Sequence, residues 1–171
     1  MLIPEKLINF RVFENGADQL GLADVTLPTL EAITNTIKGA GLAGEIDSPV
    51  LGHIGSAKLE LNWRTLDVPA AHFAAPKSFL FDIREANQVK DTGTGKYVIQ
   101  GIKVVVRGVP TTAALGKGDM GTTSDTKTTI EVDYIKVTID GKEVLEADKY
   151  NYIFKVEGKD YLKDVATALG L

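Results

Sequence analysis

The sequence predicts a mainly β fold, a sandwich or barrel that carries one or two short α-helices. Seventeen glycines and frequent turn dipeptides divide the 171 residues into short runs. Many of these runs are rich in Val, Ile, Thr and Tyr, which fit the pleated, half-buried surface of a sheet. No linker, repeat or low-complexity segment interrupts the pattern, so we expect a single domain over residues 1–171.

The first predicted element is a hairpin. Ile8 to Glu14 and Leu20 to Leu27 are candidate strands on either side of Asn15-Gly16, a pair that tolerates the positive φ angles of a tight turn. The next stretch, Thr29 to Lys38, has an apolar spacing that suits either a helix or a strand. We favour the strand, because its threonines are β-branched and lose side-chain freedom in a helix.

Lys58 to Leu66 is the clearest predicted strand. Leu59, Leu61 and Trp63 alternate with polar neighbours, so one face of the strand should be buried and the other hydrated. We expect Trp63 to pack in the core beside the two leucines.

Two long β-branched runs follow, Lys96 to Arg107 and Thr128 to Asp140. The first run should end at a break at Gly108, and a polar loop from Pro110 to Lys127 should join the two. In the second run the apolar residues change from even to odd positions after Tyr134. This change predicts a β-bulge, or a strand that crosses between two environments.

The predicted helices are short. One covers Ala70 to Ala75, between two prolines, and the other lies at the C-terminus, with Asp160 at its start and Gly170 as its C-cap. The apolar residues of the second helix recur at the i, i+3, i+4 and i+7 spacing of one helix face: Leu162, Val165, Ala166 and Leu169.

We predict that the protein is not an enzyme and uses no cofactor or metal. The chain has no cysteine, which excludes disulfides, thiolate zinc sites and a cysteine nucleophile. His53 and His72 have no partner at the spacing of metal ligands, and no serine lies in a nucleophile-elbow sequence. No secretory signal or apolar run of membrane-spanning length is evident, so we expect a soluble protein made in a cytoplasm, without a membrane anchor.

Gly39 to Gly44 matches the dinucleotide-binding pattern G-x-G-x-x-G. That pattern needs a helix to begin at the glycines, so that the helix N-terminus can hold a pyrophosphate. Glu45, Asp47 and Pro49 follow instead, which form a loop-like sequence with two anionic residues near any phosphate. We therefore interpret these glycines as a mobile loop between strands.

The net charge of −4 argues against nucleic-acid binding. The acidic excess lies in the N-terminal half, and neither half has the basic surplus that a phosphate-binding surface requires. Passive contact with DNA is compatible with this charge.

Sequence segments spread over nearly the whole chain form one further pattern. The N-terminal part holds Ile3-Pro4, Leu7, Asn9 and Phe13 ahead of Gly16, then Thr26 to Leu30 with a central Leu-Pro, then the glycine motif. The C-terminal third is the most specific part and contains Asp140 to Val144, Val156 to Asp160 and the final Leu169 to Leu171. Together these segments resemble the major tail tube proteins of contractile phage tails, a family also found in R-type bacteriocins.

The resemblance implies a tail-tube-type β-sandwich or barrel whose copies form hexameric rings. The rings would stack into a hollow tube inside the sheath of a virion tail, for genome delivery by a phage or membrane puncture by a bacteriocin. DNA would pass through the lumen without specific binding. The implied partners are further copies of the chain, the tail sheath protein, the baseplate and the tail terminator protein, with assembly in the host bacterial cytoplasm.

Three sets of residues are candidates for this assembly. The glycine loop and its flank, residues 39–55, are assigned to ring stacking, with Gly39, Gly41, Gly44, Asp47, Pro49 and Gly52 as named positions. The polar loop is assigned to contacts with a neighbouring subunit or the sheath, through Pro110, Leu115, Gly116, Lys117 and Asp119. A lumen through which DNA slides should repel phosphate, and the candidates for this charge are Asp24, Glu31 and Glu60.

Two other functions are compatible with the sequence. A secretion-system tube of related fold shares the ring architecture but delivers proteins. A monomeric β-sandwich that binds carbohydrate or peptide belongs to a different class, and it would normally expose aromatic residues, whereas alternation places the only tryptophan, Trp63, inside. An infectious phage, a defective prophage and a bacteriocin are all compatible sources.

Overall fold

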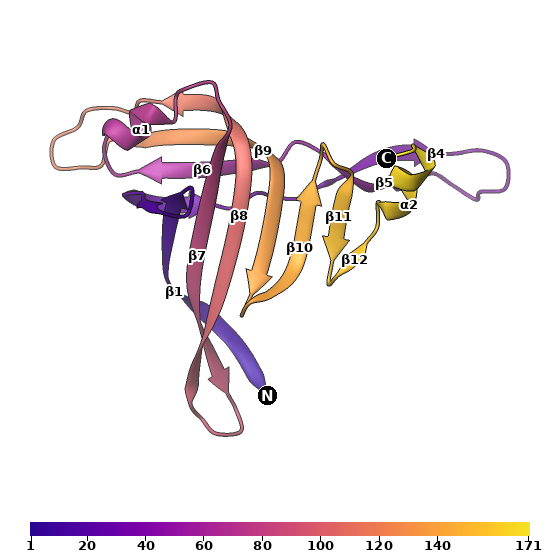
Figure 1. Cartoon of the computed structure of the whole chain (residues 1–171), viewed down its shortest axis with the longest axis horizontal. Helices are drawn as coiled ribbons and strands as arrows, with labels where there is room; N and C mark the ends of the chain where they lie inside the picture. The colour runs from indigo at the N-terminus through magenta and orange to yellow at the C-terminus, as the bar shows by residue number, and fades with distance from the viewer.

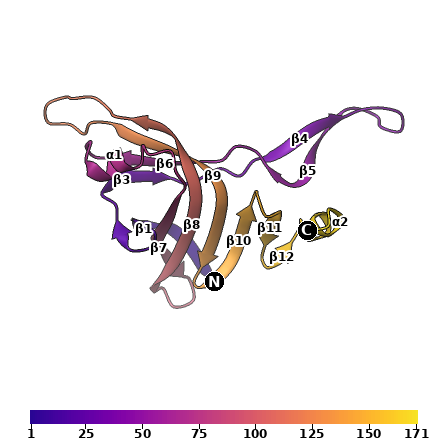
Figure 2. The ribbon, with the colours of Figure 1, turned by 45° about the horizontal axis from the view of Figure 1, so that its top comes forward.

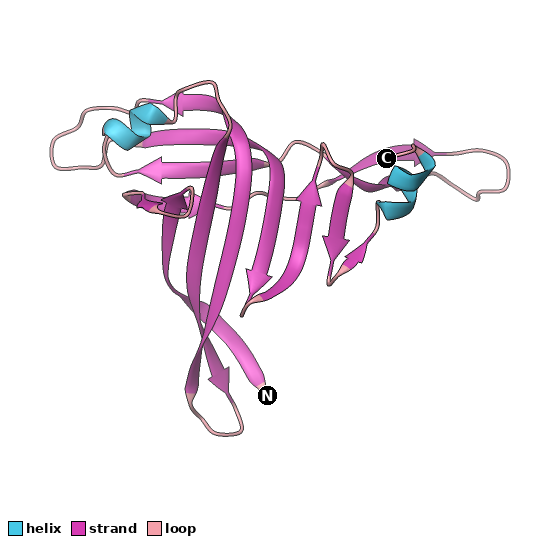
Figure 3. Ribbon diagram, viewed as in Figure 1, coloured by secondary structure: helices cyan, strands magenta, loops and turns pink.

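The computed structural model describes residues 1–171 as an antiparallel β structure with two short helices (Figures 1 and 3). Ten strands join in one large sheet, and β4 (Ala32–Ile37) and β5 (Ile46–Ile54) form a separate two-stranded ribbon. The helices are α1 (Val68–His72) and α2 (Lys163–Ala168), and neither is long and apolar enough to cross a membrane. The predicted mainly β fold with short helices is confirmed, as is the strand predicted within Thr29 to Lys38. The strands of the large sheet are β1 (Leu2–Glu14), β2 (Asp18–Gln19), β3 (Leu22–Thr26), β6 (Lys58–Trp63), β7 (Phe79–Asp91), β8 (Tyr97–Ala114), β9 (Thr126–Ile139), β10 (Lys142–Asp148), β11 (Ile153–Val156) and β12 (Lys159–Asp160).

The large sheet divides at β9. Along one side β9 pairs with β8, and the order continues through β7 to β1 and β2. On its other side the first half of β9 pairs with β6, which pairs with β3, whereas the second half pairs with β10, followed by β11 and β12. The long strands bend over β3 and β6, and the β10–β12 strands extend away from them (Figures 1 and 2). One strand therefore serves two different neighbours.

The division coincides with a β-bulge at Asp133. Gly108 pairs with Val132 and Arg107 pairs with Tyr134, so Asp133 is an extra residue in β9. The predicted change of apolar phase is thus confirmed, and both alternatives hold: the strand has a bulge and also crosses between two sheet partners. The predicted break at Gly108 is wrong, because β8 bends there and continues to Ala114.

Gly108 is required by the close approach of the two strands. A Cβ atom at this position would overlap the backbone carbonyl of Glu131 and crowd Ile130. Only glycine leaves that space empty. Gly108, which we predicted to end the strand, therefore allows β8 to bend and continue.

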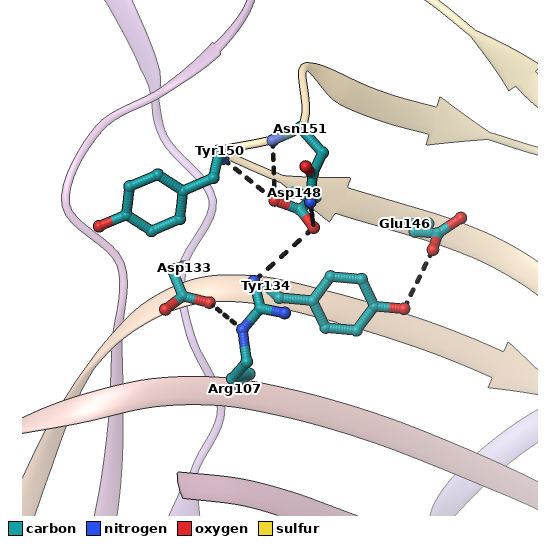
Figure 4. A network of polar contacts seen from close by, with 7 residues as sticks. All are labelled: Arg107, Asp133, Tyr134, Glu146, Asp148, Tyr150 and Asn151. Carbon is teal, nitrogen blue, oxygen red and sulfur yellow. Dashed lines mark hydrogen bonds and ion pairs between the residues drawn. The ribbon is translucent and has the colours of Figure 1, made fainter. Parts of the chain in front are cut away.

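An ion-pair and hydrogen-bond network holds the bulge against the end of β10 (Figure 4). The Arg107 Nε atom donates to Asp133 Oδ1 at 2.6 Å, and its terminal nitrogen lies 3.7 Å from Asp148 Oδ2. The Asp148 carboxylate is buried and accepts three further hydrogen bonds, from the backbone N–H groups of Tyr150 and Asn151 and from the Asn151 side chain. The network therefore links β8, β9 and the turn after β10.

The pKa of Asp148 reports the balance of this network. Burial raises the pKa of the carboxyl. The hydrogen bonds from Asn151 and Tyr150 and the charge of Arg107 lower it, and together they outweigh the effect of burial, so the pKa of Asp148 lies below the ordinary aspartate value. The ionised form is therefore the one that stabilises the fold.

The core lies between the bent strands, β6 and α1. Trp63 stacks on Phe73 with 5.8 Å between ring centroids, and its indole N–H donates to Thr128 at 3.0 Å. Leu59 and Leu61 are buried beside it, which confirms the predicted orientation of β6. Helix α1 brings Phe73 to this cluster.

The predicted Ala70 to Ala75 helix is only partly correct. It begins at Val68 and ends at His72. Asp67 caps the first turn by accepting from the Ala70 N–H at 2.9 Å, and Pro69 fits in that turn, where its missing N–H costs no helix hydrogen bond.

The N-terminal hairpin is confirmed at its turn and wrong in its second strand. Asn15 and Gly16 have φ angles of 50° and 76°, as a tight turn requires. However, β1 pairs with β2 only at Phe13 and Glu14, and β3 then pairs with β6. The apolar side chain of Leu22 is buried in the core, so core packing outweighs continuation of the local hairpin.

The C-terminal helix is confirmed. Gly170 has a φ of 77°, and the N–H groups of Gly170 and Leu171 donate to Thr167 and Ala166, which forms a complete Schellman cap. Asp160 precedes the helix but does not cap it, because its carboxylate accepts from Phe154 and Leu162.

We expect Asp148→Asn to destabilise the free subunit by about 2 kcal/mol near neutral pH, since a neutral amide cannot replace a buried, multiply bonded carboxylate. Because the folded-state pKa is lowered, this contribution is present above the ordinary aspartate pKa of about 4 and is lost as the pH falls through the lowered value. Urea unfolding followed by Trp63 fluorescence should show the difference between variant and wild type shrinking with acidification. The exposed Asp164→Asn is the control, and a constant difference would contradict the assignment.

We expect Gly108→Ala to destabilise the subunit by about 3 kcal/mol, because the added methyl group overlaps backbone rather than a movable side chain. Gly101→Ala, in the same strand, is the matched control, since its Cβ would meet its nearest neighbour at 4.0 Å. Urea unfolding of both variants tests this, and equal stability would show that the bend at Gly108 tolerates a side chain.

Candidate assembly surfaces

The β4–β5 ribbon projects from the rest of the molecule (Figures 1 and 2). Gly39, Gly41 and Gly44 lie in the turn region at its tip, and Gly39 and Gly41 have φ angles of 146° and 95°. The flank predicted as loop is a strand instead, because Asp47, Pro49 and Gly52 all lie in β5. The phosphate-binding interpretation stays rejected, since a strand and not a helix follows the glycines.

The ribbon is amphipathic. Ile33, Ile37 and Ile46 lie on one face together with the Asn35–Ser48 pair, because residues two apart in a strand point the same way and Ile37 pairs with Ile46. Thr36 and Asp47 lie on the other face, where the threonine hydroxyl donates to the carboxylate at 2.7 Å. The side chains of Ile37 and Ile46 are 49% and 56% exposed. An isolated two-stranded ribbon is marginally stable in water, and this one leaves its isoleucines about half exposed.

The root of the ribbon is fixed to the C-terminal part of the chain. Leu162 packs directly against the Cα of Gly52, so closely that a Cβ at Gly52 would lie 2.6 Å from it. The Gly55 carbonyl accepts from the Lys149 ammonium at 2.9 Å, and the Gly55 N–H donates to the Glu31 carbonyl at 2.8 Å. These contacts set the direction in which the ribbon projects.

The second predicted loop is shorter than expected. Pro110 lies in β8, which extends to Ala114, and β9 begins at Thr126. The remaining loop contains the other four named positions, Leu115, Gly116, Lys117 and Asp119.

Local hydrogen bonds and ion pairs order the start of this loop. The Lys117 N–H donates to the Ser124 carbonyl at 2.7 Å, and its ammonium lies 3.2 Å from Asp125. Leu115 and Met120 are exposed, so the loop presents apolar side chains to its surroundings.

The three candidate lumen residues are not all together. Asp24 in β3 and Glu60 in β6 share a face, because Asp24 pairs with Asn62. Each already has a partner: the Asn62 amide donates to Asp24, and Lys127 lies 2.7 Å from Glu60. Glu31 lies apart, just before β4.

Sequence reasoning missed a charged surface on the large sheet. On the face opposite the core, Asp82 lies 2.8 Å from Arg84 and 3.3 Å from Lys103. Lys136 and Glu143 form a similar pair at 2.7 Å. Asp82 and Arg84 are neighbours on one face of β7, whereas Lys103 lies in β8, and Lys136 and Glu143 lie in β9 and β10. The strand register brings these cross-strand pairs together.

A free strand edge was also missed. Along β1, residues 2–12 pair with β7 on one side, but β2 covers only Phe13 and Glu14 on the other. Strand β3 likewise pairs only with β6. Unpaired edges are templates for pairing with another chain.

The histidines do not form a metal site. The His72 Nε2 atom lies 3.3 Å from a Glu14 oxygen, and its ring packs edge-on against Phe73 and Phe79. No group of three metal-ligating side chains occurs in the structure.

Comparisons with known proteins agree with the resemblance found in the sequence. The family model of the phage tail tube protein FII matches residues 4–170. The chain is 32% identical over 176 residues to the tail tube protein of Escherichia phage P2, covering 100% of both chains. It is 26% identical over 178 residues to the major tail tube protein of Serratia phage KSP20, covering 100% of this chain and 99% of the relative.

Solved structures support the fold. The sheath/tube terminator of an extracellular contractile injection system aligns with a TM-score of 0.54 at 14% identity, over 79% of this chain and 96% of that one. A chain of the sheath-tube complex from such a system aligns with a TM-score of 0.53 at 13% identity, over 79% and 91%. With a family match along nearly its whole length, the chain belongs to the phage tail tube protein FII family and is a structural subunit of a tail tube.

Proposed function

We propose that copies of this chain close into hexameric rings and that the rings stack into a hollow tube inside a contractile sheath. The unpartnered apolar face of the β4–β5 ribbon carries this proposal, because a monomer would leave it in water. Residues 1–171 act in this assembly as a single tail tube domain.

Ring closure uses the free edges of the large sheet. Strand β1 offers an unpaired edge along most of its length, and β3 offers another. Pairing between neighbouring subunits would satisfy these backbone groups, and a closed ring leaves no edge exposed.

Ring stacking uses the ribbon, including the glycine positions 39, 41 and 44 at its tip and Asp47, Pro49 and Gly52 in β5. The β8–β9 loop, with Leu115, Lys117 and their neighbours, contacts an adjacent subunit or the sheath. The sheath protein, the baseplate and the tail terminator are the further partners. The similar contractile injection systems contain a sheath-tube complex and a sheath/tube terminator, which supports the first and the last of these.

The lumen carries DNA without binding it specifically. Asp24, Glu31 and Glu60 supply the negative charge that keeps phosphate from adhering. The relatives are phage proteins, which favours genome delivery over the membrane puncture of a bacteriocin and over protein export by a secretion tube. The assembled tail is a virion component that forms in the host bacterial cytoplasm.

We expect Ile37→Asp to block tube formation, since a charge would be buried in every ring contact at a cost of about 2 kcal/mol or more each. Thr34→Asp, on the polar face of the same ribbon, is the matched control and should still form tubes. Negative-stain electron microscopy of concentrated protein, with and without sheath and baseplate partners, gives the result. Discrete wild-type monomers under all conditions would refute self-assembly.

We expect a triple change of Asp24, Glu31 and Glu60 to Lys to leave tubes intact and to slow DNA passage, because the lumen would then attract phosphate. Infectivity of a phage assembled from the variant measures this. Lysines at the exposed Asp18, Glu157 and Asp164 give the same charge change elsewhere and form the control. Normal infectivity of the first variant would remove these residues from the lumen.

A further inference from the structure

The core-forming face of the large sheet is incompletely covered. On the side of the sheet where β9 pairs with β6, this face is covered by β3 and β6. Beyond these strands it lines a hollow of about 380 Å³. Most of the lining is aliphatic and includes Leu27, Leu30, Ile102, Val137, Ile139 and Leu145. Val98, four residues before Ile102 on the same face of β8, is 45% exposed. The subunit therefore has a second apolar surface that it does not bury itself.

One carboxylate lies in this apolar hollow. Glu85 is paired across the strands with Phe10 and Ile102, and it forms no ion pair. Burial raises its pKa above the ordinary glutamate value. Two residues along the same face, the Asn87 Oδ1 atom is the one buried side-chain polar atom with no hydrogen-bond partner. This part of the sheet offers acceptors and lacks a cation.

The β4–β5 ribbon has the complementary chemistry. Its apolar face carries Ile33, Ile37 and Ile46 around the one polar pair Asn35–Ser48. Lys38 follows β4 directly, its side chain is 74% exposed, and its ammonium forms an exposed ion pair with Glu45 at 3.7 Å. The isoleucine side chains of the ribbon match an aliphatic hollow, and the long Lys38 side chain beyond the end of β4 supplies a cation for the unpaired carboxylate.

A subunit cannot fill its own hollow with its own ribbon. The contact of Leu162 with Gly52 and the hydrogen bonds of Gly55 hold the ribbon root so that it projects away from the large sheet (Figures 1 and 2). The occupant must then come from another molecule, and a second copy carries a surface of the right kind.

We propose that the apolar face of the β4–β5 ribbon of one copy docks into the hollow around Glu85 of a second copy, with Lys38 beside the Glu85 carboxylate. The proposal rests on the self-assembly proposed above and names the surface that receives the ribbon. It makes Glu85 and Ile102 part of the contact between copies, although within one subunit β4 and β5 pair only with each other.

Cross-linking between single-cysteine variants tests this docking, because the chain has no native cysteine. Ile37→Cys subunits are mixed with Ile102→Cys subunits, assembled into tubes and treated with a short bismaleimide. We expect a cross-linked dimer that appears only in assembled material. Thr34→Cys, on the opposite face of the ribbon, replaces Ile37→Cys in the matched control, and there the dimer should be lost.

The outcomes separate this inference from the proposed function. Tubes that form without the Ile37–Ile102 cross-link, or with an equal cross-link from Thr34→Cys, overturn the docking and leave self-assembly intact. If the wild-type chain forms neither rings nor tubes, self-assembly fails and the docking fails with it.

A charge exchange provides an independent measurement. Lys38→Glu and Glu85→Lys should each reduce tube formation, and the double variant that carries both changes should restore it, since the opposite charges meet again. Restoration would not follow from a purely structural role of either residue. If each single variant assembles like wild type, or if the double variant assembles no better than the singles, the Lys38–Glu85 contact is refuted.

Discussion

The ion pair between Arg107 and Asp133, which Asp148 extends to the end of β10, stabilises the point at which β9 changes its partner from β6 to β10. Asp133 is the extra residue of a bulge, and an unpaired bulge residue is free to point its side chain at a partner in the next strand. Arg107 supplies that partner from β8, and the buried Asp148 carries the connection to the end of β10. The bulge is thereby held at a single position, and with it the place where β9 exchanges β6 for β10.

This division separates a part of the sheet whose apolar face is covered by other elements from a part whose apolar face is partly open. Where β9 pairs with β6, the elements β3, β6 and α1 enclose Trp63 and three phenylalanines in a dense core. On the other side, β10 to β12 continue the sheet without a second layer, so the hollow around Glu85 stays open and the ribbon projects from its root at Gly52 and Leu162. A subunit of a polymer has this character, because the missing layer can be supplied by the next copy.

The two faces of the large sheet also differ in how their charged residues are paired. Acidic and basic groups on the outer face of the large sheet pair across strands, as Asp82 does with Lys103 and Lys136 does with Glu143. The partly exposed Lys136–Glu143 pair adds little to stability, whereas Asp82 is buried and lies close to two cations. The unpaired Glu85 lies instead on the apolar face, where the proposed contact between copies can use it.

Much of this structure was predictable from the sequence, because alternation and turn chemistry are local. The pattern of Leu59, Leu61 and Trp63 determined which face of β6 is buried, and Gly170 marked the end of α2. The change of apolar phase predicted after Tyr134 indicated a bulge, which the structure places one residue earlier, at Asp133. The strand partners were not predictable in the same way. Leu22 packs in the core and its strand pairs with β6 and not with β1. Gly108 allows a strand to bend where the sequence predicted its end. Strand register places Asp24 and Glu60 on one face, whereas Glu31 lies apart. Pairing between distant strands is decided by the packing of the whole chain, and so only the tertiary structure revealed the projecting ribbon and the hollow that could receive it.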